Sequence, residues 1–158
     1  MDQLALEIYE FVDGNDDQKC LGIDILINER SLREIIREVE RPFAAAEGSP
    51  DLAGGYRGLH PEQVLAPSRQ LLGEPLKGLR HVSRDPFDVA IFVCAGCGEP
   101  GCWPLMVRVE VHEHNVVWSG FNQPHRRDKW SYEALKPFTF DRAQYEWALQ
   151  KPRRRDSY

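Results

Sequence analysis

Apolar and polar residues alternate in two stretches near the N-terminus. In the first stretch Leu4, Leu6 and Ile8 occupy every second position. The second stretch has the same period and contains Leu21, Ile23, Ile25 and Ile27. A period of two residues is typical of a strand with one face on the core. Because the turn-forming residues 13–17 lie between the two stretches, we predict an opening β-hairpin.

A helical period follows the hairpin. The apolar positions of this segment are Leu32, Ile35, Ile36, Val39 and Phe43, which predict an amphipathic helix over residues 32–41. Ser31 and Glu34 have the spacing of a capping box, and Pro42 disfavours continuation beyond about Arg41. A second helix is predicted over residues 142–150, with Asp141 as its cap, Gln144 closing the box and Phe140 packed on Tyr145.

Residues 47–77 separate these regions and are rich in glycine and proline. That density of helix and strand breakers permits only short helical turns. Leu71 and Leu72 are the apolar pair that we expect to anchor this irregular crossing to the core.

The second half of the chain again has strand patterns. Residues 88–94 are largely apolar, as in a strand that is covered on both faces, whereas residues 104–112 and 116–121 predict a second hairpin. We therefore predict an α+β fold, in which an antiparallel sheet of two hairpins plus a buried strand packs against two main helices.

Length and composition suit one domain over residues 1–158, since the chain is 42% hydrophobic. The net charge of −5 argues against a nucleic-acid partner. No apolar run approaches the roughly 20 residues of a membrane span, and the N-terminus lacks a signal-peptide pattern, so we expect no membrane partner and a cytoplasmic location. Residues 151–158 are predicted to be a mobile basic tail.

The most distinctive chemistry lies between Cys94 and Trp103. Cys94 and Cys97 form a C-x-x-C-G turn, and Cys102 follows closely. Thiolates in this arrangement are zinc ligands, and a tetrahedral site needs a fourth, for which His125 is the first candidate. The other candidates are His112, His114 and Cys20. The alternative is a set of reduced cysteines in a glycine-rich turn, with no metal.

The same thiols suggest a second function class, a thiol-dependent enzyme or redox protein that uses Cys97 and Cys102 with His125 as base. In this hypothesis Cys102 and His125 are the catalytic candidates. The strand pattern that follows Trp103 argues against it, because a thiol at a helix N-terminus would have been activated by the helix dipole.

A polar loop with flanking aromatic residues follows the second hairpin. Its candidate binding residues are Gln123, His125, Arg126, Arg127 and Trp130. Arginines in such a loop can hold an anion or an acidic partner. The alternative is that Phe121 and Trp130 are core anchors and that the charges between them are solvated. The leading hypothesis is a non-enzymatic binding or regulatory protein that recognises another protein through this loop, and a zinc-stabilised scaffold is the third hypothesis.

Several segments also resemble a family of small bacterial proteins of unknown function. The resemblance rests on residues 97–105 (CGEPGCWPL), 121–126 (FNQPHR) and 138–145 (FTFDRAQY), and it extends over most of the chain. It implies a bacterial, intracellular source and a single compact domain. It assigns no catalytic or binding residue.

Overall fold

The structure is a computed structural model that describes residues 1–14, 17–79 and 86–155. In these residues the strands are β1 (Leu4–Val12), β2 (Lys19–Ile27), β3 (Arg30–Ser31), β4 (Tyr56–Gly58), β5 (Asp88–Cys94), β6 (Leu105–Val111), β7 (Asn115–Asn122), β8 (Phe138–Asp141) and β9 (Arg153–Arg154). The α-helices are α1 (Leu32–Ala46), α2 (Pro61–Val64) and α3 (Arg142–Gln150). The predicted α+β class is confirmed.

The strands of the described residues form two sheets. The smaller sheet has the order β3-β2-β1-β9 and the larger has the order β4-β5-β6-β7-β8. The predicted hairpins are present as β1–β2 and β6–β7, but each belongs to a different sheet. The predicted buried strand is β5, which lies between β4 and β6 and is almost wholly buried.

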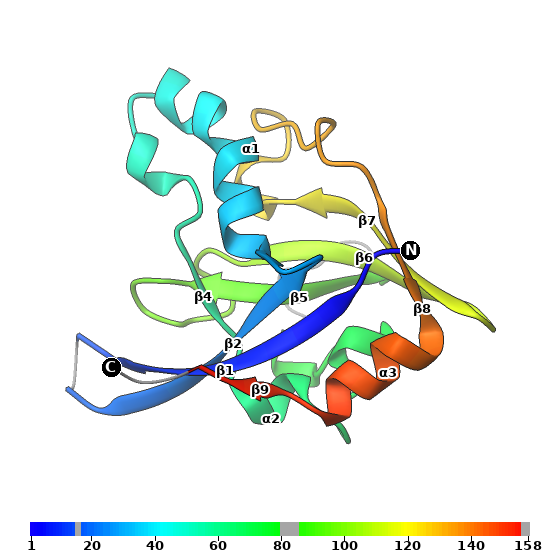
Figure 1. Ribbon diagram of the computed structural model, residues 1–158. Coiled ribbons are helices and arrows are strands. Elements are labelled where there is room, and N and C mark those ends of the chain that lie inside the picture. Colours follow the sequence, from blue (N-terminus) through cyan, green and yellow to red (C-terminus); the bar gives the residue numbers. More distant parts are fainter. Residues whose placement is uncertain (15–16, 80–85, 156–158) are drawn as a thin grey trace.

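One core joins the two sheets. Figure 1 shows the β1–β2 hairpin crossing the larger sheet, with α1 on one side of the hairpin and α2 and α3 on the other. Gly58 lies where β4 approaches β2, and a Cβ atom at this position would stand 2.2 Å from the carbonyl oxygen of Ile23. Only a residue without a side chain allows the two backbones to come this close.

Helix α1 is longer than predicted. It continues through Pro42 to Ala46. Ser31 is the N-cap residue and pairs in β3, but its side chain makes no capping bond. Pro42 removes one backbone hydrogen bond, but the last turn buries Ala44 completely against Ala53 and Trp130. Burial of this turn therefore outweighs the local preference of proline.

Helix α3 has the predicted bounds. The Asp141 carboxylate accepts from the backbone N–H of Gln144 at 3.0 Å, and the rings of Phe140 and Tyr145 lie 5.3 Å apart. Gln144 does not close the capping box. Its side-chain amide instead bonds both the N–H and the carbonyl of Leu4, which docks α3 onto β1.

The glycine- and proline-rich crossing has only short elements, as predicted. These are α2, β4 and the 3-10 turns η1 (Pro50–Leu52), η2 (Gln70–Leu72) and η3 (Lys77–Leu79). Leu71 is fully buried, as expected of an anchor. The neighbouring Gln70 is also fully buried and bonds the carbonyl of Ala90 and the N–H of Leu76, so the crossing is tied directly to β5.

The C-terminal segment differs from the prediction of a mobile tail. Arg153 and Arg154 form β9, which pairs in parallel with Glu7 and Ile8 of β1. Arg155 continues this contact through its N–H, which donates to the carbonyl of Ile8 at 3.0 Å. Residues 151–155 are therefore part of the fold, and residues 156–158 lie outside the described part of the chain. Within the described residues, no helix combines the length and the apolar character needed to cross a membrane.

Candidate metal centre

Three cysteines meet at one end of the larger sheet. Cys94 is the last residue of β5, while Cys97 and Cys102 lie in the turn that leads to β6. Their sulfur atoms all lie within 4.8 Å of one another, and all three thiols are free. Cys97 and Cys102 are exposed and Cys94 is half-buried, so the cluster opens toward solvent.

Backbone hydrogen bonds give the cysteine turn its shape. The N–H of Gly98 donates to the carbonyl of Cys94 at 2.9 Å, and that of Cys102 donates to the carbonyl of Glu99 at 3.1 Å. Gly98 has a φ of +70°, in the left-handed region that favours glycine. The sequence Cys-x-x-Cys-Gly thus folds back so that the thiols converge.

The thiols differ in acidity. Burial raises the pKa of Cys94, but the backbone N–H groups of Cys97 and Gly96, together with the other two thiols, bond its sulfur and bring the pKa below its usual value. The pKa of Cys102 is raised to about 12, chiefly because its thiol is hydrogen-bonded to Cys97 and Cys94. In the metal-free centre Cys94 therefore loses its proton more readily than Cys102.

Arg57 of β4 contacts the cysteine turn. Its guanidinium donates to the carbonyl of Ala95 at 3.0 Å, and a Cβ atom on Gly98 would lie 2.7 Å from its Nη1. The same guanidinium lies 3.6 Å from the carboxylate of Asp13 and packs over the ring of Phe11. Arg57 therefore brings a positive charge to the turn and connects it to the β1–β2 hairpin.

The sulfur positions suit a thiophilic cation. Sulfur atoms bound tetrahedrally to Zn²⁺ at about 2.3 Å lie about 3.8 Å apart, so the cluster needs to contract by no more than about 1 Å. Three protein ligands leave one coordination position open. Among the described residues, the group of convergent ligands contains only Cys94, Cys97 and Cys102.

The structure does not place His125 in this group. Its Nε2 atom lies 2.9 Å from the carbonyl oxygen of Gly101, and its ring stacks on Trp103 with the centroids 6.0 Å apart. His125 therefore contacts the cysteine turn without joining the sulfur cluster, which corrects the expectation of a fourth ligand. As the predicted base for Cys102 it also lacks the expected effect, because the pKa of that thiol is raised.

The other candidate fourth ligands lie elsewhere. His112 and His114 follow β6 at its far end, and a strand of seven residues, about 20 Å long, separates them from the cysteine turn. Their Nε2 atoms lie 3.6 Å from Glu110 and 3.7 Å from Glu113. Cys20 is the second residue of β2 and lines a small hollow together with Arg57, outside the sulfur cluster.

Only some residues of the loop after β7 are exposed at the surface. Gln123 and Trp130 are buried, so these two predicted binding residues are not available to a partner at the surface. Arg126 packs over the rings of Trp103 and Trp130, and it pairs with Glu47 at 3.1 Å. Of the predicted binding residues, His125 and Arg127 are exposed and Arg126 is half-exposed.

Gln123 connects this loop to the interior. Its side-chain amide donates to the carbonyl of Pro104 at 2.9 Å and to the hydroxyl of Tyr56 at 3.1 Å, and its oxygen accepts from the N–H of His125. Its role is therefore to hold the loop against the start of β6. An isolated glutamine in a polar loop carries no sequence signal for this role.

A buried carboxyl group lies behind the loop, and sequence reasoning missed it. Glu40 of α1 is fully buried and accepts from the N–H of Gly54 at 2.8 Å, from the Tyr56 hydroxyl at 2.6 Å and from the Tyr132 hydroxyl. Burial raises the pKa of Glu40, and these donors offset only part of that effect. The pKa values of Tyr56 and Tyr132 are raised as well, first by burial and then by interactions that include the charge of Glu40.

Comparisons of the chain with family models, curated proteins and solved structures found no match. The resemblance to small bacterial proteins therefore stays a prediction.

Proposed function

We propose that the protein binds Zn²⁺ through Cys94, Cys97 and Cys102, and that it acts as a non-enzymatic binding or regulatory protein whose surface depends on this centre. The observation that carries the proposal is the convergence of three sulfur atoms within 4.8 Å in an exposed turn. Soft thiolates select Zn²⁺ over Mg²⁺ or Ca²⁺, which prefer oxygen ligands.

The electrostatics of the centre also support a cation. Three thiolates at this distance repel one another. In the metal-free state the pKa of Cys102 is raised chiefly by hydrogen bonds of its thiol to Cys97 and Cys94, and to a smaller extent by this repulsion. A divalent cation removes the repulsion and displaces the remaining protons. The backbone N–H groups of Cys97 and Gly96, which bond the sulfur of Cys94, would then stabilise a metal-bound thiolate.

The test is the metal content of the full chain, purified without an affinity tag or chelator and measured by elemental mass spectrometry. Each of the variants C94S, C97S and C102S is compared with C20S, which removes the cysteine that lies outside the cluster. We expect close to one zinc ion per chain for the wild type and for C20S, and a large loss for the other three. Cobalt added to the metal-free wild type should give a thiolate-to-metal charge-transfer band that C20S retains.

A wild-type chain that contains no zinc and gives no charge-transfer band with cobalt would reject the centre. Equal zinc content in C20S and C102S would reject the assignment of its ligands. The binding role has a separate test, which is affinity capture with the wild type and C97S from a bacterial lysate. A partner retained by the wild type and lost with C97S is expected, whereas capture that is identical for both proteins would remove the link between the centre and recognition.

The rival hypothesis of a thiol enzyme finds less support in these contacts. A nucleophilic cysteine needs a low pKa, and that of Cys102 is raised to about 12. The thiol with a lowered pKa is Cys94, which is half-buried at the end of β5. Neither the raised pKa of Cys102 nor the half-buried position of Cys94 argues against a metal centre, because such a centre needs three convergent sulfur atoms and not a single activated thiol.

A further inference from the structure

Away from the cysteines, two carboxylates face each other on the smaller sheet. Asp24 of β2 lies directly opposite Glu7 of β1 in the antiparallel register. Like charges in this position repel each other and destabilise a sheet. Asp24 is also almost completely buried, with 1% of its surface exposed, so its charge requires cationic partners.

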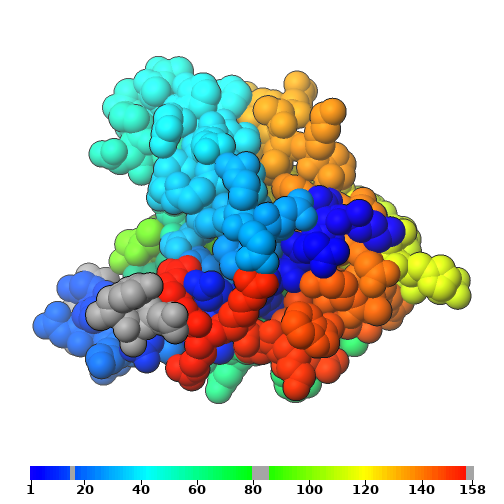
Figure 2. All heavy atoms as spheres, viewed as in Figure 1, coloured from blue at the N-terminus to red at the C-terminus, as the bar shows by residue number. Residues whose placement is uncertain are grey.

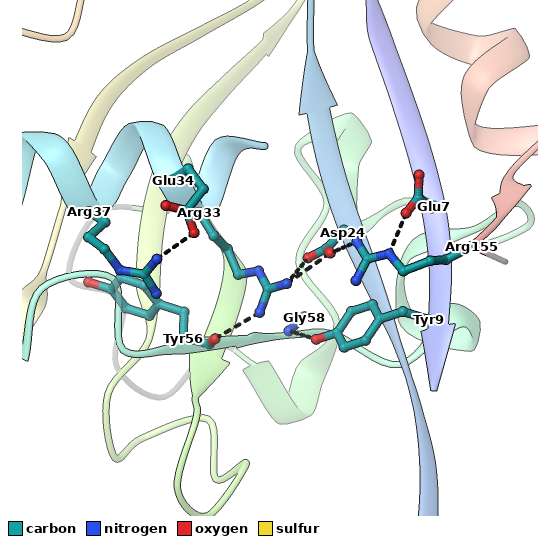
Figure 3. Close-up of polar contacts among 9 residues, drawn as sticks. All are labelled: Glu7, Tyr9, Asp24, Arg33, Glu34, Arg37, Tyr56, Gly58 and Arg155. Atoms are coloured by element: carbon teal, nitrogen blue, oxygen red, sulfur yellow. Dashed lines mark hydrogen bonds and ion pairs between the residues drawn. The ribbon is translucent and has the colours of Figure 1, made fainter. Parts of the chain in front are cut away.

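Two arginines supply that charge from opposite sides. Arg33 of α1 places its Nη2 atom 2.7 Å from one oxygen of Asp24 and 2.8 Å from the other. Arg155, just beyond β9, pairs with both Asp24 and Glu7. Figure 3 shows Asp24 between the two guanidinium groups, with Glu7 on the far side of Arg155.

Tyr9 completes the arginine site. The guanidinium carbons of Arg33 and Arg155 lie 5.2 Å and 5.0 Å from the centroid of its ring, within the range of cation–π attraction. The Tyr9 hydroxyl accepts from the N–H of Gly58 at 2.9 Å, which fixes the ring. The position of Arg155 is thus a site with two carboxylates and an aromatic face, which suits a planar guanidinium better than an ammonium group.

The backbone beside this site is a strand edge. Residues 153–155 extend the smaller sheet by pairing in parallel with Glu7 and Ile8, and Arg153 forms a bidentate pair with Glu29 at 2.7 and 2.8 Å. Arg153 and Arg155 therefore place two guanidiniums, two residues apart, on three carboxylates. In Figure 2 this red segment lies at the molecular surface beside the blue hairpin.

We propose that the edge of β1 is a docking site for an extended segment of another protein that carries arginines two residues apart, and that residues 153–155 occupy it in cis. Addition of a strand to an exposed sheet edge is a common mode of peptide recognition. The internal occupant is suited to exchange, because β9 has only two residues and both are exposed. Its pair between Arg153 and Glu29 is exposed on both sides and contributes little to stability.

The test measures binding of a fluorescent peptide with the sequence of residues 151–155 to the full chain by polarisation. In the wild type the tethered segment competes, so the peptide should bind weakly. The variant R153A/R155A should bind it at least about tenfold more tightly. R154A is the matched control, since it changes the exposed arginine between the two, and it should bind as weakly as the wild type.

Two further reagents identify the site. Adding E7Q and E29Q to R153A/R155A should abolish the gain, and a peptide with lysine in place of its three arginines should bind at least about tenfold more weakly. If circular dichroism shows that R153A/R155A does not fold, the single variant R153A replaces it, with a smaller gain expected.

A variant R153A/R155A that binds no more tightly than R154A would overturn the proposal. So would equal binding of the lysine peptide, which would indicate nonspecific attraction to an acidic protein. A wild-type chain that elutes as a dimer, and a variant R153A/R155A that elutes as a monomer, would overturn it in favour of exchange of the C-terminal segment between two copies.

Discussion

The Nε2 atom of His125 lies 2.9 Å from the carbonyl oxygen of Gly101, the residue immediately before Cys102. A carbonyl oxygen can only accept, so Nε2 carries a proton in this contact. That nitrogen is then not free to coordinate a metal, and among the described residues the convergent group of ligand atoms contains neither ring nitrogen of His125. His125 therefore positions the cysteine turn from η4 (Pro124–Arg126) without serving as a ligand.

The first prediction separates these two roles. In H125A the zinc affinity should fall by no more than about tenfold. A loss of this size is at the lower end of what is found when a residue that contacts a metal ligand, but does not bind the metal, is replaced. In C102S it should fall by more than about a hundredfold, because a ligand is lost. Competition with a chromophoric chelator measures both affinities. An H125A variant as weak as C102S would make His125 the fourth ligand after all.

The second prediction concerns pH. Cys102 must lose its proton before its sulfur can bind zinc, and in the metal-free centre its pKa is raised to about 12. Each proton released on zinc binding makes the apparent affinity rise about tenfold for each pH unit, so binding should strengthen with rising pH and weaken in acid. The same chelator competition at several neutral pH values gives the slope. C102S should have a slope that is smaller by one proton, and identical slopes would show that Cys102 is not deprotonated on binding.

The third prediction concerns Glu40, whose pKa is raised above the ordinary value of 4.5 by burial. A carboxyl group with a raised pKa in the folded state binds its proton more tightly there than in the unfolded chain. Its contribution to the free energy of unfolding is therefore fully present below the unfolded pKa and is lost as the pH rises through the folded value. The wild type should lose stability relative to E40Q over that window.

Substitution of Glu40 by alanine should have a different result. E40A leaves the N–H of Gly54 and the hydroxyls of Tyr56 and Tyr132 without their acceptor in a buried site. We expect a loss of about 3 kcal/mol at neutral pH, and a smaller loss for E40Q, which keeps one acceptor oxygen. Urea unfolding of both variants at acidic and neutral pH measures these differences. A wild type and an E40Q variant with parallel pH profiles would contradict the raised pKa.

Local patterns predicted most of the elements correctly. The alternation around Leu6 and Ile25 placed the first hairpin, and the cap at Asp141 placed the start of α3. Pairing between distant segments was not predictable in this way. The sequence has no local signal that β4 joins β5 or that Arg153 joins β1, because each of these strands has only two or three residues and is held by its partners.

The same distinction between local patterns and distant contacts applies to the candidate site. The convergence of Cys94, Cys97 and Cys102 follows from short spacings and a glycine turn, and it was predictable. The burial of Gln123 and the role of Glu40 depend on contacts with segments that are far away in the chain, such as Tyr56. For the same reason the sequence alone could not exclude His125 as a ligand.

The last prediction tests how the two sheets are held together. A methyl group on Gly58 would lie 2.2 Å from the carbonyl oxygen of Ile23. This oxygen belongs to the backbone, so no side-chain rotation can relieve the contact. G58A should therefore push β4 away from β2 and lower the free energy of unfolding by about 3 kcal/mol.

G78A is the matched control, since a Cβ atom there meets no atom within 4 Å, and its stability should change by less than about 1 kcal/mol. Urea unfolding followed by tryptophan fluorescence compares the two, and equal stability of G58A and G78A would mean that the close contact between the sheets is not required. Because Tyr56 and Arg57 precede Gly58 on β4, the loss in G58A should also reduce zinc affinity, whereas G78A should bind zinc like the wild type.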